Sequence, residues 1–326
     1  MKKNIAIVAG GNSSEVVVSL KSAAGLYSFM DKERYNVFIV TIVGKIWQVE
    51  ISDKEKIAIE KNDFSFIQNG EKTIFDIAYI TIHGTPGENG ILQGYFELIG
   101  LPYSSCNVLA AAITFNKFTC NQYLKGFGVK VSESLVLRSG QTVSNEEVAV
   151  KIGFPCFVKP NVGGSSFGVT KVKTVEQLQS AIVKAFAEGE EVLIEAFMEG
   201  TEITCGIYKT KTKSQVLPVT EVVPKNEFFD FDAKYKGEVE EITPARISDS
   251  LTERVQHLTS AIYDILGCKG IVRIDYIISV GEVINLLEVN TTPGMTTTSF
   301  IPQQVAAAGL DIKAVITEII ENELNS

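Results

Sequence analysis

The chain contains few of the residues from which structural metal sites and disulfide frameworks are built. Its 326 residues include two histidines and five cysteines, and the cysteines are scattered and form no C-x-x-C pair: Cys106, Cys120, Cys156, Cys205 and Cys268. An odd number of isolated thiols indicates a reducing compartment and argues against a zinc site or a disulfide scaffold.

Long hydrophobic runs are also absent. No stretch of eighteen apolar residues occurs, and the start MKKNIAIVAGG leads into a strand-like segment rather than the core of a signal peptide. We therefore expect a cytoplasmic protein with no membrane partner. The net charge of −9 argues against a nucleic-acid partner, so an anionic ligand needs a local cluster of basic side chains and backbone N–H groups.

Strand and helix patterns alternate along the first hundred residues, which predicts a parallel sheet with helices on its faces. The expected strands are Asn4–Ala9, Val37–Val43 and Phe75–Ile82, and the expected helices are Val16–Met30 and Gly90–Gly100. Ligands of such sheets bind beyond the carboxyl ends of the strands, which is where GGNSSE (10–15) and HGTPGENG (83–90) lie. Ser13 or Ser14 is expected to cap the helix that follows the first of these loops.

The pattern then changes, and we expect an α/β protein, α+β in parts, with three domains at 1–103, 104–197 and 198–326. Residues 107–127, 144–152, 174–187, 249–266, 301–309 and 311–324 are expected to be helical, with strands at 155–159, 192–195, 202–208 and 215–222. The segment 224–244 exceeds the usual loop length and carries three phenylalanines and Tyr235, so we interpret it as a lid.

The most informative stretch is GIVRIDYIISVGEVINLLEVN, two apolar runs joined by a tight turn. If Gly281-Glu282 forms a two-residue type II′ loop, paired positions sum to 563. Asp275 then faces Glu288, Arg273 faces Asn290, and all four side chains share one sheet face.

Two carboxylates that face each other across a hairpin lie roughly 5 Å apart and repel each other unless a proton or a cation lies between them. Oxygen ligands without histidine suit Mg²⁺ held together with substrate phosphates. The pair Asp275 and Glu288 therefore predicts a magnesium site. A solvated hairpin face with an Arg273–Asp275 ion pair is the alternative.

The segment VKPNVGGSSFGVTKV (158–172) is predicted to bind phosphate. Glycines allow close backbone approach, the N–H groups and hydroxyls of Ser165 and Ser166 can cradle phosphate oxygens, and Lys159 can neutralise charge. The segment lacks the Walker pattern, and an ordinary hairpin turn is the alternative.

Further candidates lie elsewhere in the chain. Glu195, the backbone at Phe197–Met198 and Glu202 are spaced to contact an adenine and a ribose, although carboxylates flanking a turn are usually solvated. His83 ends a buried strand beside two glycines, where it is a substrate ligand or a structural residue. Lys117 can reach a phosphate or lie solvated on its helix.

Eight motifs span essentially the whole chain in this order: GGNSSE, HGTPGENGILQG, NKFTCNQYL, FPCFVKPNVGGSSFGV, LIEAFMEGTE, FDAKY, GIVRIDY and LLEVNTTPGMTTTSFIP. Together they resemble the D-alanine–D-alanine ligases of the ATP-grasp superfamily. The resemblance implies a three-domain ATP-grasp fold with a Rossmann-like first domain.

The resemblance also implies a role for each matching residue. The implied ligands of two Mg²⁺ ions, or Mn²⁺ in their place, are Asp275, Glu288 and Asn290. The implied contacts of ATP, a co-substrate, are Lys117, Lys159, Lys234, Glu195, Phe197, Met198 and Glu202. The implied oxyanion donors are Arg273 and the Gly294 N–H, and the implied amino-acid contacts are Glu15, His83, Ser299 and Phe300. An implied trio of Glu15, Ser165 and Tyr235 closes the lid.

Four positions depart from the family pattern without touching the implied metal ligands. Val16 replaces a basic residue, Gly163 stands where many members have an acidic one, and Asn89 and Asn116 replace aspartates. These departures bear on loop closure rather than on the reaction.

The activity implied is the joining of two D-alanine molecules for peptidoglycan, through a D-alanyl phosphate, by an enzyme that forms a homodimer. A ligase that takes D-lactate is one alternative, against which Tyr235 argues because phenylalanine accompanies D-lactate in the family. The other alternative is a catalytically silent nucleotide-binding regulator. The presence of Arg273 together with the implied metal ligands argues against it, because a regulator does not need all of them.

Overall fold

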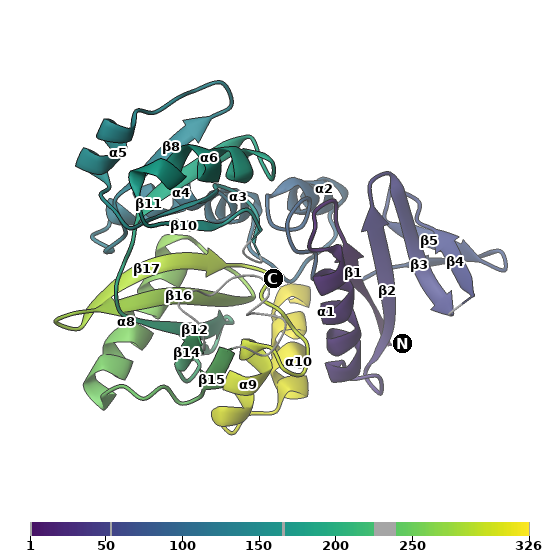
Figure 1. Cartoon of the computed structure of the whole chain (residues 1–326). Coiled ribbons are helices and arrows are strands. Elements are labelled where there is room, and N and C mark those ends of the chain that lie inside the picture. The colour runs from purple at the N-terminus through teal and green to yellow at the C-terminus, as the bar shows by residue number, and fades with distance from the viewer. Residues whose placement is uncertain (1, 53, 165–166, 225–238, 326) are drawn as a thin grey trace.

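The structure is a computed structural model that describes residues 2–52, 54–164, 167–224 and 239–325. The first hundred residues form a five-stranded sheet, at the right of Figure 1, and a separate two-stranded sheet. Two further sheets, from the rest of the chain, lie one above the other at the left. The expected α/β class is confirmed, and the division into three domains stays a prediction.

The first sheet has the strand order β4-β3-β2-β1-β7. Its parallel part is formed by β1 (Lys3–Gly10), β2 (Tyr35–Val43) and β7 (Ile77–Ile80), with α1 (Val16–Phe29) and α2 (Ile91–Ile99) as the connecting and following helices. All five elements were expected. The loops after β1 and β7 therefore emerge at the same edge of the sheet, as the parallel arrangement requires.

The remaining strands of this region were not expected, and they are antiparallel. They are β3 (Ile46–Ser52), β4 (Glu55–Ala58), β5 (Ser65–Gln68) and β6 (Glu71–Ile74). Asn69 (φ 52°) and Gly70 (φ 84°) join β5 to β6, and two consecutive positive φ angles are what a type I′ hairpin turn needs. The Asn-Gly pair was thus a usable sequence signal for this hairpin.

The central region has an antiparallel sheet of order β10-β9-β11-β8. Its elements are α3 (Val108–Phe115), α4 (Lys117–Lys125), β8 (Ser134–Arg138), α5 (Asn145–Lys151), β9 (Cys156–Pro160), β10 (Thr170–Val172), the 3₁₀ turn η1 (Val175–Gln177), α6 (Leu178–Phe186) and β11 (Glu191–Ala196). The single helix expected at 107–127 is two helices. Asn116 separates them, because its extended backbone ends α3 and its side chain accepts the Thr119 N–H at the start of α4.

The last region is a sheet of order β15-β14-β12-β16-β17 with β13 attached to β12. Its elements are β12 (Thr201–Lys209), β13 (Ser214–Val216), β14 (Thr220–Pro224), β15 (Val239–Ile242), α8 (Asp249–Ile265), β16 (Ile271–Ser279), β17 (Val283–Asn290), α9 (Phe300–Ala307) and α10 (Ile312–Leu324). The expected helices and strands of this region are confirmed, with the strand at 215–222 divided into β13 and β14.

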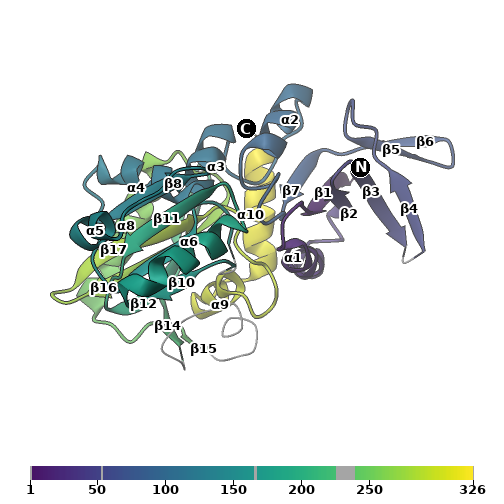
Figure 2. The same cartoon turned by 45° about the horizontal axis from the view of Figure 1, so that its top comes forward.

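Helix α10 joins the first region to the last. Its buried residues Val315, Ile316, Ile319 and Ile320 share one apolar cluster with residues of β1, α1 and β12. Figures 1 and 2 both show α10 beside α1. This packing holds the loops after β1 and β7 next to the C-terminal sheet. Within the described ranges, no helix is long and apolar enough to cross a membrane.

Candidate active site

A cavity of about 800 Å³ lies between the central sheet and the C-terminal sheet. Most of the predicted site residues that the structure describes line it: Glu15, Lys117, Lys159, Glu195, Phe197, Met198, Glu202, Arg273, Asp275, Glu288 and Phe300. The other described ones, His83, Asn290, Gly294 and Ser299, lie outside its lining. Ser165, Ser166, Lys234 and Tyr235 fall outside the described residues, as does most of the expected lid.

The expected pairing across the hairpin is confirmed. Asp275 on β16 lies opposite Glu288 on β17, and Arg273 lies opposite Asn290. Arg273 and Asp275 are 9% and 7% exposed and form the ion pair of the alternative interpretation, which is thus buried rather than solvated.

The turn of the hairpin differs from the expectation. Residues 280–282 form a three-residue loop, with Gly281 and Glu282 both at positive φ, and Ser279 pairs with Val283. The register is therefore shifted by one at the tip. A bulge at Leu287 shifts it back, since Tyr276 pairs with Leu286 while Asp275 pairs with Glu288. The two one-residue shifts of register cancel, so Asp275 still lies opposite Glu288.

The Asp275 carboxylate is held by three neighbours. Arg273 donates from Nε to Oδ1 (2.9 Å) and from Nη2 to Oδ2 (2.8 Å). Thr204 Oγ1 donates to Oδ1 (2.5 Å), and Asn290 Nδ2 donates to Oδ2 (3.0 Å). Burial disfavours the guanidinium charge, but the adjacent Asp275 outweighs burial and raises the pKa of Arg273. The guanidinium of Arg273 therefore stays charged, and its two bonds to Asp275 fix its orientation.

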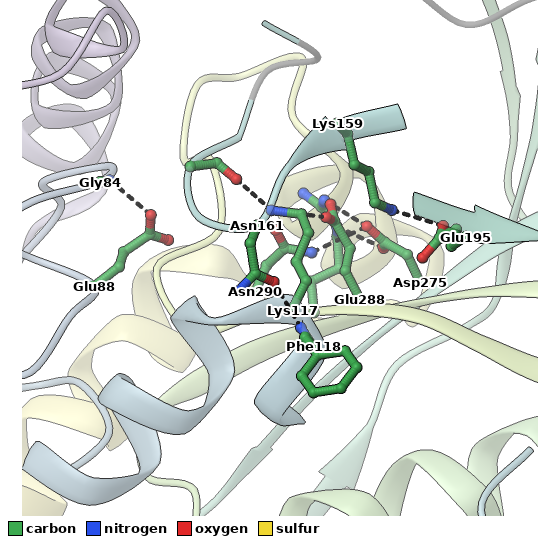
Figure 3. Close-up of polar contacts among 12 residues, drawn as sticks. Gly84, Glu88, Lys117, Phe118, Lys159, Asn161, Glu195, Asp275, Glu288 and Asn290 are labelled. Carbon is green, nitrogen blue, oxygen red and sulfur yellow. Dashed lines mark hydrogen bonds and ion pairs between the residues drawn. The ribbon is translucent and has the colours of Figure 1, made fainter. Parts of the chain in front are cut away.

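Lys117 lies next to the carboxylate of Glu288, as Figure 3 shows. Its Nζ lies 4.0 Å from Glu288 Oε2 and donates to the Gly163 carbonyl of the glycine-rich loop. Burial lowers the pKa of Lys117, although Glu288 opposes this effect. A bound phosphate would favour the charged form further.

Lys159 and Glu195 form a buried ion pair in the cavity wall. Lys159 Nζ donates to Glu195 Oε1 at 2.7 Å, from neighbouring strands β9 and β11. Beside them, the Phe197 ring lies 5.9 Å from Phe157 and 3.8 Å from the ammonium of Lys171. The predicted nucleotide-base contacts therefore adjoin an aromatic wall. Lys171 was missed because nothing in its sequence context distinguishes it.

Asn161 is a second residue that the sequence did not reveal. Its Oδ1 accepts the Phe118 N–H (2.8 Å) and its carbonyl accepts the Lys117 N–H (3.0 Å), so it holds the start of α4 (Figure 3). Its Nδ2 donates to Glu191 Oε2 (2.7 Å). Hydrogen bonds from Asn161, and then from Arg138 and Asn116, lower the pKa of Glu191. Lys117 is thereby tied to the glycine-rich loop.

The loops of the first region lie against the same site. A Cβ added to Gly164 would stand 2.9 Å from Glu15 Oε1, which places Glu15 against the glycine-rich loop. The expected N-cap of α1 is wrong, because the residue that precedes the helix is Glu15 and neither Ser13 nor Ser14. Ser13 Oγ instead accepts the Glu15 N–H (3.2 Å) and donates to the His83 carbonyl (3.2 Å). Ser13 thus ties the two loops together.

His83, Glu88 and Ser22 meet the C-terminal loop 291–299. His83 Nε2 lies 3.3 Å from Ser22 Oγ, which accepts the N–H of Met295 (3.4 Å). Glu88 accepts hydrogen bonds from the Gly84 N–H (2.7 Å) and from Thr292 Oγ1 (2.6 Å).

The end of this loop leads into α9. Ser299 precedes α9, and its Oγ accepts the Thr296 N–H (3.1 Å). A Cβ added to Gly294 would lie 3.0 Å from the same oxygen. The Phe300 ring centroid is 5.2 Å from the Arg273 guanidinium carbon. Of the implied amino-acid contacts, Phe300 therefore lies beside the buried Arg273–Asp275 pair, and Ser299 is its neighbour in the chain.

Known proteins match the chain over nearly its full length. Residues 4–106 match the model "D-ala D-ala ligase N-terminus" and residues 123–321 match "D-ala D-ala ligase C-terminus". The D-alanine--D-alanine ligase of Bacteroides fragilis is 71% identical over 323 residues, which cover 99% of this chain and 100% of that protein.

Solved structures agree with this assignment. The VanG D-Ala:D-Ser ligase of Enterococcus faecalis superposes with a TM-score of 0.86 at 28% identity, covering 99% of this chain and 100% of that one. The Bacillus anthracis D-alanine--D-alanine ligase complexed with ATP gives 0.77 at 29% identity, covering 99% and 97%. The expected ATP-grasp fold is confirmed. This chain belongs to the D-alanine–D-alanine ligase family.

Proposed function

We propose that this chain joins two D-alanine molecules into D-alanyl-D-alanine for peptidoglycan, using ATP and passing through D-alanyl phosphate. Its close relative carries that activity in its name, and an ATP complex is known for a neighbour of the same fold. The observation that carries the proposal is the meeting of Arg273, Asp275, Glu288 and Asn290 beside one cavity.

We assign magnesium to Asp275, Glu288 and Asn290. In the parts of the chain that the structure describes, no three His, Cys, Asp or Glu side chains converge on one point, so the donor set is two carboxylates and an amide. Hard oxygen donors of this kind fit Mg²⁺, with phosphates completing its shell. When bound, Mg²⁺ supplies positive charge that neutralises the phosphate oxygens.

In the first step, the carboxylate of one D-alanine attacks the γ-phosphate, and ADP leaves. A free carboxylate is a poor acyl donor because its leaving group is oxide, whereas an acyl phosphate loses phosphate readily. The step requires positioning and charge neutralisation, which we assign to Lys117, Lys159 and Lys234. We assign the adenine and ribose to Glu195, Phe197, Met198 and Glu202, and the first D-alanine to Glu15 and His83.

In the second step, the amine of the other D-alanine attacks the acyl carbon, phosphate leaves and the amine loses a proton. We assign the tetrahedral oxyanion to Arg273 and the Gly294 N–H, because fixed donors of this kind are worth roughly 3–4 kcal/mol. Asp275 takes the Nε–H and one Nη2–H of Arg273, which leaves three N–H bonds, two on Nη1 and one on Nη2, to donate to the oxyanion. We assign the acceptor carboxylate to Ser299 and Phe300.

Lid closure is the remaining assignment. We assign it to Glu15, Ser165 and Tyr235, because an acyl phosphate must be shielded from water.

The test is turnover by the purified protein with ATP, magnesium and D-alanine. Phosphate release that depends on D-alanine, with one dipeptide formed per phosphate, is expected. ADP formation only when D-lactate is added would favour a depsipeptide ligase, and ATP binding without turnover would favour a regulator. Tyr235→Phe should shift acceptor choice toward D-lactate, and unchanged selectivity would contradict its role.

We also propose a homodimer formed through the first region. Ile91 and Leu98 on α2 are 61% and 89% exposed, and such residues support an apolar contact. Light scattering at micromolar concentration should give twice the chain mass, and Leu98→Glu should halve it. A monomeric wild-type protein would contradict the proposal.

A further inference from the structure

Gln304 on α9 is a buried polar residue that the cavity lining does not include. Its Nε2 donates to the Thr204 carbonyl (3.0 Å) on β12 and to Thr220 Oγ1 (3.1 Å) on β14. All three residues are at most 1% exposed. A buried amide is costly unless it is hydrogen-bonded, so these two bonds fix where α9 lies on the sheet.

The residue that receives the first of these bonds also contacts the reaction centre. Thr204 donates its Oγ1 to Asp275 Oδ1 (2.5 Å), and Asp275 holds Arg273 through two hydrogen bonds. Arg273 in turn lies against the ring of Phe300, the first residue of α9. Helix α9 therefore reaches this cluster at Phe300 and again one turn later, at Gln304.

The Gln304 side chain packs closely against the backbone of Gly206. A Cβ added to Gly206 on β12 would lie 2.6 Å from Gln304 Oε1 and 2.6 Å from Ile301 Cδ1. Oε1 has no hydrogen-bond partner among the described residues. The Gln304 amide therefore contributes only its two donated hydrogen bonds to this packing. A methionine at this position would fill a similar volume, would lack the two bonds, and would leave no carbonyl oxygen buried.

We propose that Gln304 is a positioning residue for the acceptor subsite. By tying α9 to β12 and β14, it sets where Ser299 and Phe300 stand relative to Arg273. The inference rests on the proposed function, in which these residues receive the second D-alanine. Displacing a bound substrate by about 1 Å can cost 10²-fold in rate, so a helix that shifts on its sheet changes acceptor binding. Gln304 acts through α9 and does not touch ATP.

Gln304→Met tests this, with Gln256→Met as the control. Gln256 on α8 also donates its Nε2 to a backbone carbonyl, that of Leu217 (3.1 Å), and the buried apolar residues of α8 belong to a different apolar cluster from those of α9. Initial rates against D-alanine concentration resolve two Michaelis constants, because the two molecules occupy different subsites. Gln304→Met should raise the constant of the second D-alanine roughly tenfold, while the constants of the first D-alanine and of ATP stay within about twofold. Gln256→Met should change none of the three.

Gly206→Ala is the second variant, because its methyl group meets both Gln304 and Ile301 and so displaces α9 without deleting a donor. The same selective rise is expected, and circular dichroism identifies which variants are folded. If the folded variants show an unchanged constant for the second D-alanine, or an equal rise in all three, Gln304 does not position the acceptor. A wild-type protein that forms no dipeptide would instead contradict the proposed function itself.

Discussion

Glu88 Oε1 lies 2.6 Å from Thr292 Oγ1, so a carboxyl group of the first region is hydrogen-bonded to the loop that precedes α9. Burial, and then the charge of Glu15, raise the pKa of Glu88 from 4.5 to about 7. The folded protein therefore binds this proton more tightly than the unfolded chain does.

The raised pKa of Glu88 predicts a pH-dependent stability. The contribution of the protonated group is complete below pH 4.5 and is lost as the pH rises to about 7. Glu88→Gln has no proton to lose, so its free energy of unfolding should not fall in this way. Between pH 4.5 and about 7, the difference in free energy of unfolding between variant and wild type should therefore change in favour of the variant by up to roughly 3 kcal/mol. Urea unfolding at pH 5, 6, 7 and 8 measures the difference, with Glu253→Gln on α8 as an exposed control. A difference that is constant with pH would contradict the assignment.

Glu288→Gln should lower turnover by about three orders of magnitude, because the amide removes one of the two charged side chains that would hold magnesium. Phosphate release at saturating ATP and D-alanine measures the effect. Glu282→Gln at the tip of the same hairpin is the control and should be near wild type, since Glu282 pairs with Arg254 far from the cavity. Near-normal turnover of Glu288→Gln would remove Glu288 from the metal site.

Lys159→Ala should raise the Michaelis constant for ATP at least roughly tenfold and lower stability by about 3 kcal/mol, because Glu195 loses its partner in a buried ion pair. Steady-state rates and thermal unfolding measure the two effects. Lys184→Ala on the exposed face of α6 should change neither. An unaltered dependence on ATP concentration would argue against a phosphate contact.

Asn116→Asp restores the residue common in the family, and we expect it to destabilise this protein. Asn116 Nδ2 donates to Glu191 Oε2 (3.1 Å), so an aspartate would place a second carboxylate against Glu191. Urea unfolding at pH 7 should show a loss of about 2 kcal/mol that shrinks toward pH 4. Asn116→Ser keeps the cap of α4 without the charge and should lose less. Equal losses in both variants would contradict the charge argument.

The elements of the fold with strong periodicity could be predicted from the sequence. Alternating apolar runs located β1, β2 and β7, and helical spacing located α8 and α10. The polar segment of β3 to β6 has weak apolar alternation and was missed, although Asn69-Gly70 marks its hairpin. Propensity alone does not show that β3 and β4 add to an edge of the first sheet while β5 and β6 form a separate two-stranded sheet.

The pairing of Asp275 with Glu288 was predicted correctly from a turn that was wrong. The buried residues Ile284, Leu286 and Val289 are spaced by two and then by three, which is the sequence signal of the bulge. Asn161 and Thr204 were missed for a different reason. Their partners, Glu191 and Asp275, lie 30 and 71 residues away, and no local pattern carries such contacts.

The five cysteines are all free and all buried. Thiol reagents should therefore react slowly with the folded protein, because none of its own sulfurs is accessible. One cysteine introduced on the surface, for example Val280→Cys at the 94% exposed tip of the hairpin, would then take up a fluorophore selectively. The natural chain is thus ready for single-site labelling, without the usual removal of native thiols.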